Sequence, residues 1–102
     1  MSFFDYYTEN AVSLQDLGSN NHAWPLSDIT KISAIARQHN LIVLGGDVFY
    51  LKGNNIDFTY DSWYYDGDSS EESVQKMIDY LELFQNDSGE NLLFSVIIRE
   101  LK

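Results

Sequence analysis

Residues 44–66, LGGDVFYLKGNNIDFTYDSWYYD, decide the fold because they predict a β-hairpin. Both arms are rich in β-branched and aromatic residues, as strands are. Between the arms, Lys52-Gly53-Asn54-Asn55 supplies the glycine and asparagine that tight turns between neighbouring strands need. The acidic side chains of the hairpin, set against the single base Lys52, are Asp47, Asp57, Asp61 and Asp66. This composition is more typical of a surface displayed to a partner than of a catalytic one.

Length and composition predict one domain over residues 1–102, large enough to bury a core without disulfides or metals. The absence of cysteine excludes a disulfide framework, thiolate zinc sites and a cysteine nucleophile, and it fits a reducing compartment. The N-terminus lacks the basic and apolar regions of a secretory signal, so we expect a cytoplasmic protein. The longest apolar runs, 41–44 and 92–98, are far shorter than the roughly 20 residues that span a bilayer.

The charge of the chain narrows the class of partner. Sixteen acids and six bases give a net charge of −10, which argues against binding nucleic acid or an anionic membrane. A partner selected by charge is therefore basic, and the alternative is that acidity only keeps the protein soluble. No Lys or Arg lies between Lys52 and Lys76. The acids within that interval, the acidic segment, are Asp57, Asp61, Asp66, Asp68, Glu71 and Glu72.

Apolar spacing predicts the remaining elements. Three- and four-residue spacing predicts a first helix over Phe3–Leu17 and a second from Ser27, or just before it, to His39. A third helix carries the apolar residues from Val74 to Phe84, and its cap is Ser69, Ser70 or Ser73. After a turn at Asp87-Ser88-Gly89, residues 92–101 predict a strand in the middle of a sheet. The expected fold is a small α+β domain of order α-α-β-β-α-β, whose antiparallel hairpin and C-terminal strand form a sheet of about three strands against the helices.

Two glycines in the first hairpin arm require a reason, because glycine weakens a strand. A turn centred near Gly53 and Asn54 brings Gly45 and Gly46 close to residues 61–63 on the other arm. The indole of Trp63 can then cover the glycine backbone, and a local bulge is the other common reason for paired glycines. We therefore interpret Trp63 as structural, and Trp24 likewise.

Candidate catalytic and metal sites are weak. Ser, His and Asp occur without the spacing of a nucleophile elbow. His39 suits a helix C-terminus and His22 a surface loop. Asp47 and Asp61 could approach across the hairpin and bind calcium or magnesium, but neither they nor residues 66–72 have the spacing of a calcium loop. We predict no catalytic residue, no cofactor and no metal.

Three motifs follow one another along the chain: Ala23-Trp24-Pro25 before a helix, residues 43–49 (VLGGDVF) and residues 59–64 (TYDSWY). Together they resemble the immunity protein 40 family of bacterial polymorphic and contact-dependent growth inhibition toxin systems, and the resemblance covers about residues 14–84. It implies a cytoplasmic antitoxin, without catalytic activity, that binds and blocks the C-terminal domain of a cognate toxin. The tail from Gln85 lies outside the resemblance.

The composition of the acidic segment agrees with this implication. A nuclease toxin needs a basic cleft for its phosphate substrate, so an acidic inhibitor can compete for that cleft. Tyrosines add rigid interface area, and if Trp63 faces the core, alternation turns Tyr60 and Tyr64 outward. The alternative is that these tyrosines pack against a helix. The predicted partner-binding residues are Asp57, Tyr60, Asp61, Tyr64, Asp66, Asp68, Glu71 and Glu72.

Two other functions remain open from sequence. One is an acidic mimic of nucleic acid that inhibits a DNA-binding protein, for which carboxylates spaced like phosphates along an elongated surface are expected. The other is a small enzyme or metal-dependent binding module that uses Asp47 and Asp61.

Overall fold

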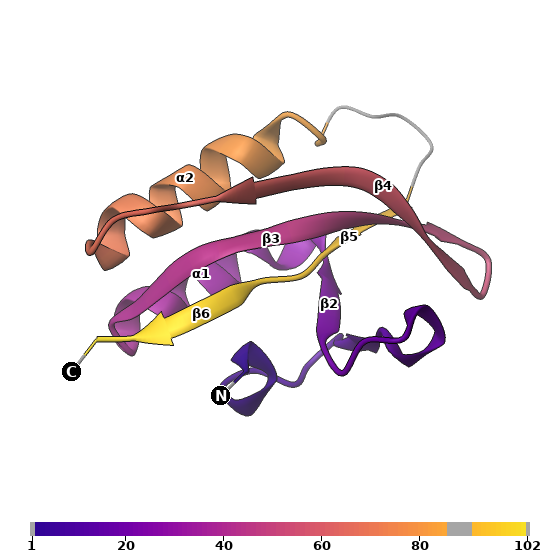
Figure 1. Ribbon diagram of the computed structural model, residues 1–102, viewed down its shortest axis with the longest axis horizontal. Coiled ribbons are helices and arrows are strands. Elements are labelled where there is room, and N and C mark those ends of the chain that lie inside the picture. The colour runs from indigo at the N-terminus through magenta and orange to yellow at the C-terminus, as the bar shows by residue number, and fades with distance from the viewer. Residues whose placement is uncertain (1, 86–90, 102) are drawn as a thin grey trace.

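One antiparallel sheet with the α-helices on one face organises the computed structural model, which describes residues 2–85 and 91–101 (Figure 1). The helices are α1 (Ile29–Gln38) and α2 (Ser70–Glu82), with short 3-10 helices η1 (Phe3–Asp5), η2 (Gln15–Leu17) and η3 (Leu26–Asp28). The strands are β1 (Val12–Ser13), β2 (His22–Pro25), β3 (Leu41–Lys52), β4 (Asn55–Tyr64), β5 (Asn91–Phe94) and β6 (Ile97–Glu100).

The sheet has six strands in the described part of the chain, in the order β1-β2-β5-β3-β4, with β6 also paired to β3. The α+β class is confirmed, but the expected sheet of about three strands is too small. The strands β1 and β2 were not predicted, because strands of two and four residues are too short to show an alternating pattern. The long strand β3 pairs with β6 along its first part and with β5 along its second, while β4 lies at the sheet edge.

The expected C-terminal strand is two strands, β5 and β6, and the single strand over residues 92–101 is wrong. The interruption falls at Ser95 and Val96, where Ser95 N–H donates to the Asp47 carbonyl (2.9 Å) and Asp47 N–H donates to Ser95 Oγ (3.2 Å). The register of β3 also shifts between Val43 and Gly45, so one straight strand cannot follow it. The predicted central position holds for β5, which lies between β2 and β3.

The predicted hairpin is confirmed as β3 and β4, joined at Gly53 and Asn54. Gly46 pairs with Trp63, which is buried, and a Cβ built on Gly46 would lie 2.6 Å from Trp63 Cη2 and 1.9 Å from the Ser95 carbonyl oxygen. The missing side chain thus makes room for the indole and for the neighbouring backbone, as the sequence predicted. Trp24 is also buried, in agreement with its structural interpretation.

The second and third predicted helices are confirmed as α1 and α2. Ser69 is the cap of α2, since its Oγ accepts from Glu72 N–H at 3.1 Å, and His39 directly follows α1. The predicted turn at Asp87-Ser88-Gly89 lies outside the described residues. None of the helices in the described residues combines the length and apolar character needed to cross a membrane.

The predicted first helix over Phe3–Leu17 is wrong, because η1, β1 and η2 occupy that segment. Its apolar residues belong to two cores: Phe3 and Tyr7 join the main core with the helices, whereas Leu14 joins a smaller core with Phe49 and Leu93. One straight helix cannot contribute apolar side chains to cores on both faces of a sheet. The chain changes direction at Asn10, whose backbone adopts a left-handed conformation (φ 60°).

Candidate functional site

The predicted partner-binding residues follow one another along the sheet edge and onto the start of α2. Four lie on β4, two lie in the loop after it, and two lie in the first turn of α2. All eight side chains are exposed: Asp57, Tyr60, Asp61, Tyr64, Asp66, Asp68, Glu71 and Glu72. Because β4 is the edge strand, no further strand of the described chain separates its outer side from solvent.

The two predicted tyrosines on β4 point outward, as alternation around Trp63 required. The side chain of Trp63 is 6% exposed and stacks against Tyr80 of α2 with ring centroids 5.4 Å apart, whereas Tyr60 is 89% exposed and Tyr64 73% exposed. The alternative that these tyrosines pack beneath a helix is therefore excluded for Tyr60. Tyr64 is partly covered, because the Lys76 ammonium lies 5.5 Å from its ring centroid.

A bulge in β4 presents Tyr60. Ser62 pairs with Asp47 and Phe58 with Phe49, so three residues of β4 face a single residue of β3 between these pairs. Tyr60, in the middle of the bulge, has a left-handed backbone (φ 66°), which is uncommon for a bulky residue.

The hydroxyl of Thr59 holds the bulge in place. It donates to the Val48 carbonyl of β3 at 2.9 Å and accepts from Asp61 N–H at 3.0 Å. The first bond ties the irregular segment to β3, and the second links the two ends of that segment to each other. The backbone at Tyr60 is therefore fixed by its surroundings.

The carboxylates of the acidic segment fall into two groups. Asp68 pairs with Arg99 (3.1 Å), and Glu71 pairs with Arg37 through two hydrogen bonds (3.0 and 3.1 Å). Glu72 accepts from the Tyr65 hydroxyl at 3.4 Å. In contrast, the described residues place no cation in an ion pair with Asp57, Asp61 or Asp66. The negative charge without an ion pair thus lies along β4, in the loop after it and, at Glu72, in the first turn of α2.

The structure adds two residues that sequence reasoning left out of the site. Phe58, on β4, is 43% exposed and stacks against Tyr60 with ring centroids 5.8 Å apart. Asp47, exposed on β3, lies opposite Ser62. Phe58 had a sequence signal, since it alternates with Tyr60, whereas the bulge that brings three residues opposite one had none. We call Asp57, Phe58, Tyr60, Asp61, Tyr64 and Asp66 the β4 surface.

Besides burial, the carboxylates on this edge raise the pKa of a tyrosine on α2. Burial raises the pKa of Tyr80, and the nearby Asp61 and Asp47 raise it further. Both carboxylates therefore act on one hydroxyl, although Asp47 pairs with Ser62 and not with Asp61 across the hairpin. Within residues 2–85 and 91–101, however, no three His, Cys, Asp or Glu side chains gather as a metal site would need.

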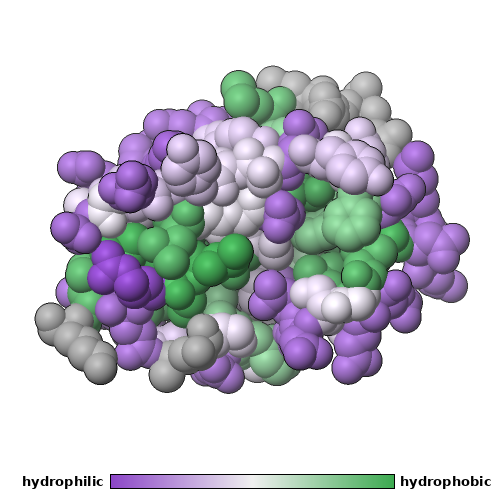
Figure 2. Space-filling model, viewed as in Figure 1, coloured by the Kyte–Doolittle hydropathy of each residue, from purple (hydrophilic) through white to green (hydrophobic). Residues whose placement is uncertain are grey.

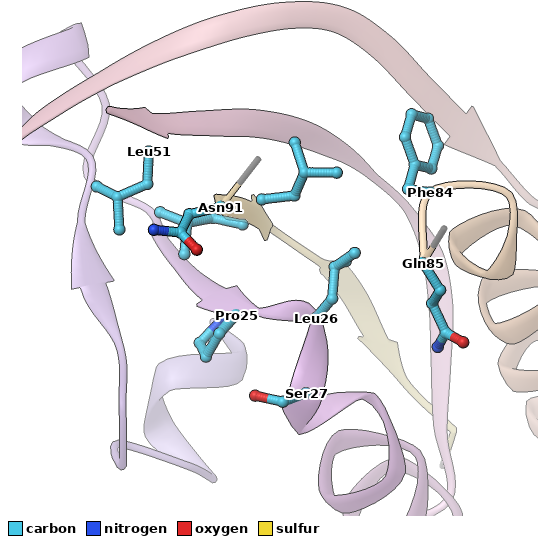
Figure 3. Close-up of a pocket in the computed structure, with 9 residues that line it drawn as sticks. Pro25, Leu26, Ser27, Leu51, Phe84, Gln85 and Asn91 are labelled. Carbon is cyan, nitrogen blue, oxygen red and sulfur yellow. The ribbon is translucent and has the colours of Figure 1, made fainter. Parts of the chain in front are cut away.

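A hollow of about 550 Å³ lies between η3 and the ends of β3, β5 and α2 (Figure 3). Its labelled side chains include Leu26, Phe84 and Gln85, and none of the described residues that line it is charged. None of the predicted binding residues is among them. Among the described residues, the hollow therefore has no convergent set of ionisable groups.

The face turned toward the viewer in Figure 1 has two apolar areas (Figure 2). One lies over β6 and the start of β3, where Ile97 is 49% exposed, and the other lies toward the hairpin turn. Hydrophilic side chains surround both. Exposed aromatic and apolar groups within a polar rim are the usual anatomy of a protein–protein interface.

The class of protein that this fold and edge define is a small partner-binding domain. Residues 13–98 match the family described as immunity protein 40, and the chain belongs to this family. The match extends past Gln85 into the tail that lay outside the sequence resemblance, and it includes β5 and the first half of β6. The family associates the chain with toxin neutralisation and with binding of a cognate toxin. No curated protein and no solved structure matches it significantly.

Proposed function

We propose that this protein binds a cognate toxin domain in the cytoplasm and blocks a basic active site, such as that of a nuclease, with the β4 surface. The observation that carries the proposal is the combination of exposed tyrosines with uncompensated carboxylates on one open sheet edge. A nuclease cleft is basic because it binds phosphates, so it complements this edge. The protein acts by occupying the cleft and needs no catalytic group. The delivering system is of the polymorphic or contact-dependent growth inhibition type.

The net charge of −10 supports the choice of a basic partner. Long-range attraction between an acidic inhibitor and a basic toxin accelerates their encounter, and this acceleration weakens as salt screens the charges. Paired carboxylates contribute less to that attraction because a guanidinium already neutralises each of them. We therefore assign the smaller electrostatic part to Asp68 and Glu71, and the larger part to the carboxylates without a guanidinium partner, which are Asp57, Asp61, Asp66 and Glu72.

The alternative of a nucleic-acid mimic is less well supported. The described chain extends 40 × 27 × 22 Å, and its radius of gyration is 12.9 Å. Such a shape lacks the elongated row of evenly spaced charges that imitates a phosphate backbone, since the uncompensated carboxylates are clustered on one edge.

The test uses the toxin domain encoded beside this protein, carrying an inactivating substitution, and measures affinity by calorimetry at low and moderate salt. Asp57→Asn/Asp61→Asn/Asp66→Asn removes three charges that have no ion pair. Asp68→Asn/Glu71→Gln/Glu72→Gln removes two charges that are ion-paired and one, on Glu72, whose carboxylate accepts from the Tyr65 hydroxyl. We expect the first variant to bind about tenfold or more weakly, with a reduced salt dependence, and the second to lose less. Equal affinity and equal salt dependence in both variants and in the unmodified protein would exclude the acidic segment from the interface.

A further inference from the structure

Apart from the buried Phe49 and Trp63, aromatic rings on the hairpin occur in three places, and two of them have a lysine ammonium of this chain nearby. The Lys52 ammonium lies 5.2 Å from the ring centroid of Tyr50, and the Lys76 ammonium lies 5.5 Å from that of Tyr64. The third place is the stacked pair of Phe58 and Tyr60, whose rings are 5.8 Å apart at an interplanar angle of 30°. Among the described residues, no ammonium or guanidinium lies over this pair.

The surroundings of the ring pair would suit such a cation. Asp57 directly precedes Phe58, and Asp61 directly follows Tyr60, so two exposed carboxylates bracket the rings. Alternation directs neighbouring side chains to opposite faces of β4, but this strand is at the sheet edge. A side chain that approaches the open edge can therefore contact a ring on one face and a carboxylate at the rim.

The backbone that carries the Tyr60 ring is also fixed before binding. Tyr60 keeps its left-handed conformation because the Thr59 hydroxyl bonds to the Val48 carbonyl and to Asp61 N–H. A ring that is 89% exposed contributes little to the core, so the strained backbone serves no packing purpose in the folded domain. Fixing an aromatic ring before binding reduces the entropy lost in the complex.

We propose that the Phe58–Tyr60 ring pair, with Asp57 and Asp61, receives an arginine side chain of the toxin. This inference rests on the proposed function and names the chemistry of its central contact. Arginine fits better than lysine because its planar guanidinium stacks on a ring while its edge donates hydrogen bonds to carboxylates. It is also less strongly hydrated than an ammonium, so it loses less when it leaves water.

The first experiment measures binding of the inactivated toxin domain to Tyr60→Ala, with Leu83→Ala as the control for an exposed apolar side chain (73% exposed) on the helix side. We expect a loss of about tenfold or more for Tyr60→Ala and little change for Leu83→Ala. One toxin Arg→Lys substitution should weaken binding to the unmodified protein but not to Tyr60→Ala. If the unmodified protein binds and Tyr60→Ala binds equally well, the inference is wrong and the proposed function stands. If the unmodified protein does not bind, the proposed function fails.

A second experiment does not depend on the toxin. The full chain is titrated with N-acetyl-arginine amide, and its aromatic proton resonances are followed by nuclear magnetic resonance. We expect the Phe58 and Tyr60 rings to shift more than the Tyr64 ring, which already has Lys76 nearby. The uncharged isostere N-acetyl-citrulline amide should cause smaller shifts, and Asp57→Asn/Asp61→Asn should reduce the effect of the arginine probe. Equal shifts with both probes, or no shift at these two rings, would overturn the inference.

Discussion

At the scale of the residue, Tyr60 combines an unfavourable backbone conformation with a side chain that is exposed to solvent. Its left-handed backbone is unfavourable for a residue with a Cβ, yet its ring is 89% exposed and adds little to the core. Such a combination is unusual where folding alone sets the sequence, because glycine would adopt the same backbone without strain. The tyrosine at this position is better explained by what it contacts outside the domain.

Tyr60→Gly should therefore be more stable than Tyr60→Ala by about 1 kcal/mol, because both remove the ring but only glycine relieves the left-handed strain. Urea unfolding of the two variants measures this difference directly. Both should weaken toxin binding to the same extent. Equal stabilities would mean that the bulge relaxes around alanine and stores no strain.

Gly46 is required for a different reason, because the surrounding atoms leave no space for a side chain at this position. A Cβ there would lie 1.9 Å from the Ser95 carbonyl oxygen and 2.6 Å from Trp63 Cη2, and backbone cannot yield as a side chain can. We expect Gly46→Ala to cost about 3 kcal/mol of unfolding free energy. Gly53→Ala is the control, because Gly53 has a positive φ (61°) but nothing within 4 Å of a built Cβ. It should cost only about 1 kcal/mol. A similar cost in both variants would contradict the close-packing explanation.

At the scale of the element, the start of α2 completes the edge of β3. Tyr65 N–H donates to the Leu44 carbonyl (2.8 Å), beyond the last residue of β4. Further along, Val43 N–H donates to Ser73 Oγ (2.9 Å), and Ser70 Oγ donates to the Leu41 carbonyl (2.6 Å). The serines of α2 thus bond to the polar backbone groups that a longer β4 would have paired. The same residues hold α2 against the sheet.

Ser73→Ala should cost about 2 kcal/mol, because it leaves the buried Val43 N–H without its partner. Ser69→Ala removes an exposed cap bond to Glu72 N–H and should cost about 1 kcal/mol. Thermal and urea unfolding of both variants test the order. A larger loss for Ser69→Ala would show that capping α2 matters more than its attachment to β3.

The elements with strong local signals were predictable. Helical spacing defined α1 and α2, and a serine cap marked the start of α2. The turn chemistry at Gly53 and Asn54 defined the hairpin. Residues 3–17 were not, because their apolar residues have helix-like spacing but serve two cores on opposite faces of the sheet. Which core each residue joins is a tertiary property that local spacing does not contain.

The candidate site was predictable in the same limited way. Alternation around Trp63 correctly placed the rings of Tyr60 and Tyr64 outside. The sequence did not show that Glu71 is paired with Arg37, 34 positions away. It also did not show the bulge, which depends on the register of β4 against β3. Pairing between distant residues therefore decides which acids of the acidic segment remain uncompensated.

At the scale of the whole molecule, acidity has a structural consequence that involves tyrosines. The pKa of Tyr6 is raised mainly by its hydrogen bond to Glu100, that of Tyr7 mainly by burial, and that of Tyr80 mainly by burial. Neighbouring carboxylates add to each shift: Glu100 and Asp5 at Tyr6, Asp28 and Glu9 at Tyr7, and Asp61 and Asp47 at Tyr80. The folded state thus holds these three phenol protons more tightly than the unfolded chain does.

This difference predicts that stability is retained at neutral pH and falls as the pH rises above about 10. The unfolded tyrosines release their protons near the ordinary pKa of 10.0, while the folded ones still hold theirs, so unfolding releases protons and becomes more favourable.

The variant Tyr7→Phe isolates the contribution of one tyrosine to this pH dependence. At neutral pH it should lose about 1 kcal/mol, because the Tyr7 hydroxyl donates to the buried Asp28 carboxylate at 2.9 Å. Between about pH 9 and 11 its urea midpoint should fall less steeply than that of the unmodified protein, because phenylalanine has no proton to lose. Tyr60→Phe, at an exposed ring, is the control and should follow the unmodified protein. A parallel decline for Tyr7→Phe would mean that Tyr7 ionises alike in both states and that alkaline unfolding arises elsewhere in this acidic chain.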